Sequence, residues 1–208
     1  YFGGELQKFV SFYTLLLAMT YAVTDVYPDP TPGSTPIQDA IDIAAPGETI
    51  IVHDGTYIEN LLIEKDIMLQ SENGAGSTII DGSLGRGLGS TVVIRPESGS
   101  SHKPMVEIDG FGITGGKGTD IINKTITLPD GTHPTEKVGG GLFVYVNSPK
   151  INNSQFLDNG NNSTDKGGAV FASGDSDAIG FYDRDHYKIN PELTPATDPL
   201  DFSNNTFL

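Results

Sequence analysis

The sequence predicts an all-β fold, a right-handed parallel β-helix (a single-stranded β-solenoid) closed at its N-terminal end by a short helix. Three observations lead to this fold class. Short β-branched runs broken by Gly, Asn and Asp fill the chain after residue 47, two motifs recur at intervals of whole coils, and a single segment has helical spacing.

The helical segment covers residues 36–44. Thr35 is expected as its N-cap, with Pro36 at the first helical position and Gln38 three residues after the cap, which is the pattern of a capping box. Pro46 and Gly47 end the segment. Its apolar residues share one face: Ile37, Ala40, Ile41 and Ala44. An open solenoid end exposes strand edges and apolar interior, so we expect this helix to cover both as an N-terminal cap.

The strands are expected at short runs of β-branched and apolar residues: 49–52, 61–63, 67–70, 78–81, 91–95, 105–109 and 111–114. Hairpin-rich sandwiches also contain many short strands, so internal repetition decides between the two folds. Gly-Gly-Gly-Leu-Phe at 139–143 recurs 28 residues later as Gly-Gly-Ala-Val-Phe at 167–171, about one coil. Asn-Ser-Gln-Phe at 153–156 recurs as Asn-Asn-Thr-Phe at 204–207, an interval that fits two coils with a little inserted length. Asn side chains at such turns are expected to stack into a ladder.

Composition bounds the function. There is no Cys, which excludes disulfides and argues against thiol and zinc chemistry, and the net charge of −15 disfavours nucleic acid and anionic lipid as partners. A polyanionic ligand would need calcium or a local basic patch. The alternative is that the acidity serves only solubility.

The domain organisation is expected to have three parts. Residues 1–23 form a signal-peptide-like apolar segment, residues 24–35 a Pro-rich linker with no element of its own, and residues 36–208 the β-helix domain. A buried strand or a lipid-lying helix is the alternative for the apolar segment. The chain stops at Leu208 within a motif that it has just repeated, which predicts a C-terminally truncated piece of a longer repeat protein. We therefore expect a secreted or cell-surface protein with no membrane span in the mature chain.

Two families share motifs with this sequence. Ala-Ala-Pro-Gly-Glu-Thr-Ile-Ile-Val at 44–52, Asp-Gly-Thr-Tyr at 54–57 and Ile-Asp-Gly at 80–82 resemble the first coils of bacterial β-helix proteins related to pectate lyases. Phe-Leu-Asp-Asn at 156–159 followed by Gly-Gly-Ala-Val at 167–170 resembles the repeats of the chlamydial polymorphic outer-membrane proteins, which are exported surface adhesins. The first resemblance implies three parallel sheets and a groove along one of them in which lyases and hydrolases hold polysaccharide; fold carries over better than function.

Catalytic chemistry finds little support. Pectate-type elimination needs calcium held by clustered carboxylates and a strongly basic Arg or Lys. Arg86 and Arg95 lie in or beside the early coils, but no carboxylate cluster follows either of them one coil later. His53, His102 and His133 stand singly in expected turns, which argues against a metal cluster or a His-based triad. We assign no catalytic residue.

The candidate binding segment lies in a non-repetitive insertion at about 174–199. Aromatic rings suit stacking on sugars, and two of its carboxylates, Asp183 and Asp185, could form a calcium ligand pair. Insertions are where solenoids usually build binding sites. The segment consists of Phe181, Tyr182, Asp183, Arg184, Asp185, His186 and Tyr187. A solvated loop, or a lid that packs its rings on the solenoid wall, is the alternative.

The predicted function is an exported β-helix scaffold that binds glycans or partner proteins and is non-catalytic in this segment. The alternative is a polysaccharide lyase or glycoside hydrolase that acts on acidic polysaccharide. No cofactor is required by the first hypothesis, although calcium is compatible with both.

Overall fold

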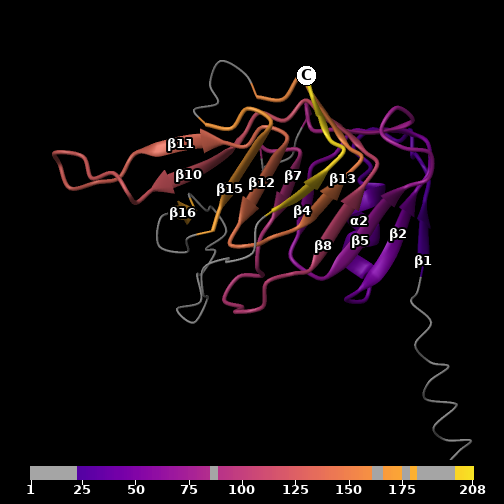
Figure 1. Cartoon of the computed structure of the whole chain (residues 1–208), viewed down its shortest axis with the longest axis horizontal. Coiled ribbons are helices and arrows are strands. Elements are labelled where there is room, and N and C mark those ends of the chain that lie inside the picture. The colour runs from indigo at the N-terminus through magenta and orange to yellow at the C-terminus, as the bar shows by residue number, and fades with distance from the viewer. Residues whose placement is uncertain (1–22, 85–88, 161–165, 175–178, 182–199) are drawn as a thin grey trace, which may run out of the picture.

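Three parallel sheets wrap around one apolar interior, so that successive turns of the chain stack as the coils of a right-handed parallel β-helix (Figure 1). The computed structural model describes residues 23–84, 89–160, 166–174, 179–181 and 200–208. The predicted fold class is confirmed by the strand pairing, because every pair within these three sheets is parallel.

A complete described coil contributes one strand to each sheet, whereas β1 adds a strand to sheet A alone and the last described coil adds strands to sheets A and B. Sheet A has six strands: β1 (Val23–Val26), β2 (Glu48–Val52), β5 (Ile67–Ser71), β8 (Val106–Asp109), β13 (Lys150–Asn152) and β17 (Asp201–Ser203). Sheet B has five: β3 (Gly55–Tyr57), β6 (Thr78–Asp81), β9 (Gly112–Thr114), β14 (Gln155–Leu157) and β18 (Thr206–Phe207). Sheet C has four: β4 (Leu61–Ile63), β7 (Val92–Ile94), β12 (Leu142–Tyr145) and β15 (Val170–Ser173). A separate antiparallel sheet joins β10 (Thr119–Asn123), β11 (Thr135–Val138) and β16 (Ile179–Phe181).

The interior is built from columns of side chains at matching positions of successive coils. On sheet A the strand register stacks four residues that are fully buried: Ile50, Leu69, Ile108 and Ile151. Burying a side chain of this size contributes roughly 1.5–3 kcal/mol, so the column stabilises every coil that it passes through. Alternate residues point outward, as the period of two along a strand requires.

The first repeat is confirmed as one coil. β12 pairs with β15 in the register that places Phe143 beside Phe171. The expectation that the second repeat spans two coils is wrong, because β14 pairs directly with β18 and places Phe156 beside Phe207. The interval is long because the insertion between β15 and β17 lies within that one coil.

An Asn ladder runs along the turn between sheets A and B, as expected. Asn204 Nδ2 donates to Asn153 Oδ1 at 3.3 Å, and Asn153 Nδ2 donates in turn to Asp109 Oδ1 at 2.7 Å. Asn153 and Asn204 both have positive φ, a conformation that Asn tolerates better than most residues.

Helix α2 (Pro36–Ile43) caps the N-terminal end and buries Ile37, Ala40 and Ile41. The expected capping box is not formed, since Thr35 makes no side-chain cap hydrogen bond. The Glu59 carboxylate performs the capping instead: its Oε1 accepts from the N–H of Ile37 at 3.0 Å and its Oε2 from the N–H of Gln38 at 2.9 Å. The Gln38 side chain bonds the backbone of Leu62 in β4, so it is not available to the helix start.

The segment expected to be a linker begins with a strand. β1 pairs in parallel with β2 and thereby occupies a sheet edge that would otherwise remain open at this end. The expectation of no element in residues 24–35 is therefore wrong for residues 24–26. The apolar residues 1–22 lie outside the described part of the chain.

Candidate functional site

The outer face of sheet C is apolar and covered. Its outward-facing residues Val93, Phe143 and Tyr145 form a second hydrophobic core with Ile121 and Val138 of the antiparallel sheet. All four residues of β12 are consequently buried. The described part of this face is thus a packed interface and not an open groove lined by carboxylates.

The antiparallel sheet that covers this face comes from two separate insertions. The β10–β11 hairpin leaves the third coil between β9 and β12, and β16 belongs to the next insertion, between β15 and β17. The two meet where β10 pairs with β16, Ile121 lying beside Phe181. In Figure 1 the hairpin projects from the body on the side remote from β1.

Polar contacts hold the hairpin in shape. Lys137 Nζ lies 2.7 Å from Asp120 Oδ1 across the strand pair, and Asn123 Nδ2 donates to Glu136 Oε1 at 3.0 Å. Lys166 Nζ, from a different part of the chain, lies 2.7 Å from Glu136 Oε2. Beyond the strands the hairpin exposes two aliphatic side chains, Ile126 at 44% and Leu128 at 38%.

The candidate binding segment of residues 181–187 is described only at its first residue. Phe181 ends β16, and its backbone pairing joins the segment to the hairpin. Tyr182, Asp183, Arg184, Asp185, His186 and Tyr187 lie outside the described residues, as does Arg86. The binding segment and its calcium pair therefore remain predictions. Nothing in the sequence pattern indicated that β16 would pair with β10, because the two are joined by backbone hydrogen bonds and not by a shared motif.

Arg95 is engaged in an ion pair between adjacent coils. Its Nε lies 2.8 Å from Glu64 Oε1, and the Arg side chain is 15% exposed. Among the described residues no group of three or more His, Asp or Glu side chains is arranged to hold a metal ion. No described helix is long and apolar enough to cross a membrane.

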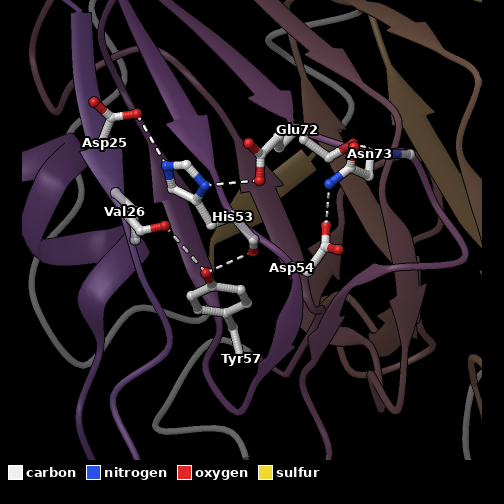
Figure 2. A network of polar contacts seen from close by, with 9 residues as sticks. Asp25, Val26, His53, Asp54, Tyr57, Glu72 and Asn73 are labelled. Carbon is white, nitrogen blue, oxygen red and sulfur yellow. Dashed lines mark hydrogen bonds and ion pairs between the residues drawn. The ribbon is translucent and has the colours of Figure 1, made fainter.

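A polar cluster surrounds His53 at the end of β2 (Figure 2). His53 Nδ1 lies 2.8 Å from Glu72 Oε2, and its Nε2 lies 3.0 Å from Asp25 Oδ1. The ring stacks on Tyr27 with centroids 4.0 Å apart and planes 7° from parallel. The hydrogen bond that the His53 ring makes to the Glu72 carboxylate is the main cause that raises the pKa of His53 above its usual value; desolvation by burial opposes this rise and the Asp25 contact adds to it.

His53 is therefore not the isolated turn residue that the sequence indicated. Glu72 lies 19 residues after it and Asp25 lies 28 residues before it, which are coil-like spacings. That spacing is the signal that could have revealed the cluster. Both ring nitrogens are occupied by carboxylates, so the ring acts as a bridge and has no free nitrogen with which to accept a proton from a substrate. His102 and His133 also have partners, Asp66 Oδ1 at 2.7 Å and the carbonyl of Ile126 at 2.6 Å.

A cleft of about 590 Å³ lies between the Pro-rich residues 29–36 and the turn at residues 56–60. Glu59 lines it, and burial raises the pKa of this carboxyl group, against the two helix N–H groups that lower it. Because those N–H groups occupy both carboxylate oxygens, Glu59 has a structural task. The lining holds two carboxylates, Glu59 and Asp29, and Asp29 Oδ1 accepts from the N–H of Thr31 at 2.9 Å.

Solved structures that are similar to this chain include the pectin methylesterase PemA from Erwinia chrysanthemi. The similarity covers 73% of this chain at 16% sequence identity, with a TM-score of 0.41. This chain corresponds to 45% of the length of that enzyme. No family model matches the sequence, and no curated protein matches it.

Proposed function

We propose that this protein is an exported β-helix scaffold that binds glycans or partner proteins, without catalysis in this segment. One observation carries the proposal: insertions from two successive coils meet in a single antiparallel sheet that projects from the solenoid. The binding surface would consist of the hairpin and the adjoining residues 181–187.

Solenoid architecture makes this arrangement significant. A regular coil needs only short turns, such as the two-residue connections between sheets A and B at 110–111, 153–154 and 204–205. Insertions on one face of a repeat protein are commonly its binding elements. Here the inserted sheet is fixed to the body by a second apolar core, which holds its outer part in a defined position for a ligand.

Charge narrows the ligand class. With 27 acidic and 12 basic residues the protein repels polyanions unless calcium intervenes. On the hairpin, Lys137 and Lys166 are each paired with a carboxylate, which removes part of the local positive charge. Neutral glycans and protein surfaces with an apolar patch fit Ile126 and Leu128 better than acidic polysaccharide does.

The test is a glycan-array measurement on the exported chain with Ile126→Ser and Leu128→Ser combined. Both side chains are exposed, so the urea unfolding curve should not change while array binding is lost. Ile43→Ser with Met105→Ser is the matched control, because these side chains are also exposed, at 82% and 74%, but lie on α2 and directly before β8. A hairpin variant that binds like the wild type would overturn the proposed surface.

Two further measurements address the remaining parts of the proposal. The lyase alternative predicts that the protein forms unsaturated, ultraviolet-absorbing products from acidic polysaccharide in the presence of calcium, and such products would refute the scaffold function. Recovery of the intact chain from the cytosol alone would refute export.

A further inference from the structure

β1 is a short edge strand whose attachment depends on side chains. It pairs with β2 over four residues, Val23 to Val26, and no described strand pairs with its other edge. Val26 is buried, and the Thr24 hydroxyl donates to the Glu48 carboxylate. A further side-chain attachment is the bridge Asp25–His53–Glu72, which joins β1, the end of β2 and the end of β5 (Figure 2).

Every element around the His53 ring brings a titratable or polar group toward it. β1 supplies Asp25, the loop after β1 supplies the stacked Tyr27, and the segment after β5 supplies Glu72. On the chain after His53, Asp54 is occupied by Asn73 at 3.0 Å. The Tyr57 hydroxyl donates to the carbonyls of His53 and Val26, and so joins β3 to the same point.

The strand carries one wall of the cleft. The Pro-rich loop runs from β1 to α2, and its residues from Asp29 to Pro36 line the cleft opposite Thr56, Glu59 and neighbouring residues. Pro28 packs directly on Gly55, where a Cβ would overlap the proline ring. One end of this wall is fixed by α2, and the other end is fixed by β1.

We propose that Asp25, His53 and Glu72 form a pH-sensitive clasp that holds β1 and the Pro-rich wall of the cleft against the solenoid. When both ring nitrogens carry a proton, each donates to one carboxylate and the clasp is closed. A neutral ring has a single N–H. Its other nitrogen is then an acceptor that faces a carboxylate, which is also an acceptor, so this hydrogen bond is lost.

The direction of the pH dependence follows from the pKa of His53. This pKa is raised in the folded protein, mainly by the hydrogen bond to Glu72. A raised histidine pKa contributes stability that is fully present below the unfolded value, about 6.5, and is lost as the pH rises through the folded value. The clasp is thus closed below about pH 6.5 and opens as the pH rises through the raised pKa of His53.

Hydrogen exchange of the full-length chain, corrected for the intrinsic rate at each pH, tests the clasp between about pH 6 and about pH 9. The amide of His53 donates to the carbonyl of Val26 and reports β1 attachment, while the amide of Val92, bonded to Gly141 in sheet C, is the internal reference. The titration of the His53 ring is followed by NMR. In the wild type the protection ratio, which is the protection of the residue 53 amide divided by that of the residue 92 amide, should fall as the ring loses its proton.

The variants separate the clasp from general alkaline loosening. His53→Gln should remove the pH dependence, and Glu72→Gln should lower the ring pKa and weaken the dependence. His102→Gln, which changes a histidine paired with Asp66 elsewhere, should keep the wild-type profile. A wild-type ratio that stays constant while His53 titrates, or a His53→Gln variant with the wild-type dependence, would overturn the proposal.

Discussion

Glu59→Ala tests how the N-terminal cap is held. In the wild type both carboxylate oxygens accept backbone N–H groups at the start of α2, and Glu59 is only 4% exposed. Alanine removes both acceptors and leaves no other described side chain that bonds these two donors. The first turn of the helix then has unpaired N–H groups in a buried position.

The magnitude follows from those two donors. An unsatisfied buried donor costs about 1–3 kcal/mol, and the Ile37 N–H is buried while the Gln38 N–H is partly buried. Removing the carboxylate also removes the cost of burying it, which is the main cause of the raised pKa of Glu59. We expect a net loss of about 2–3 kcal/mol in the free energy of unfolding.

The pH dependence provides a second readout. A carboxyl group with a raised folded pKa makes the protein less stable as the pH rises from the unfolded value through the folded one, because the folded form holds the proton longer. Glu59→Gln, which cannot ionise, should lose this decline. Glutamine still offers one acceptor, so its stability at acidic pH should lie between the wild type and Glu59→Ala.

Urea unfolding followed by circular dichroism measures these differences, with Thr35→Ala as the control. If the sequence-based capping box held the helix, Thr35→Ala would cost about 1 kcal/mol. The structure leads us to expect less than about 0.5 kcal/mol, since the Thr35 hydroxyl bonds only the exposed Asp39 carboxylate. A Thr35→Ala loss larger than the Glu59→Ala loss would refute the reasoning.

Three further predictions concern packing and titration. Gly116→Ala should destabilise the fold by more than about 3 kcal/mol in urea unfolding, because its Cβ would overlap the Gly140 carbonyl. Gly76→Ala, with open space around the new Cβ, should change the stability little. Equal effects of the two substitutions would contradict the coil spacing. Phe156→Ala should cost about 3–5 kcal/mol by the same measurement, since the ring is fully buried in the sheet B column, and a loss below 1 kcal/mol would contradict that packing. Burial raises the pKa of Tyr57 to about 12, so ultraviolet titration should show one tyrosine ionising late, and this signal should vanish in Tyr57→Phe. As unfolded tyrosine ionises near 10, this group favours unfolding above that pH.

The coil itself was predictable because its determinants are local and repeated. The Gly-Gly-x-aliphatic-Phe motif precedes a strand, and its recurrence predicted the register that places Phe143 beside Phe171. The same reasoning failed for Phe156 and Phe207, where an insertion lengthened one coil to the apparent length of two. A sequence interval gives coil number only when the loop lengths within it are known.

The contacts around the N-terminal end were predicted less well, since they join residues that no local pattern relates. The capping motif at Thr35 is a valid local signal, but the Glu59 carboxylate, which comes from a turn distant in sequence, accepts the N–H groups at the helix start instead. The His53 bridge likewise depends on β1. The prolines that follow β1 led to the prediction of a linker, so this strand was not expected. Tertiary placement, which local propensity does not contain, decided both cases.

The second core on sheet C makes the inserted sheet an obligatory part of this protein. Val93, Phe143 and Tyr145 are shielded by a hairpin that the chain could lose in a single deletion, and such a loss would bare a contiguous aromatic strip on an otherwise acidic molecule. Substitutions at these positions of sheet C and the presence of the hairpin should therefore be linked in evolution. Related proteins that lack the insertion should carry polar residues at the positions of Val93, Phe143 and Tyr145. The hairpin and the apolar outer face of sheet C should be inherited as one unit.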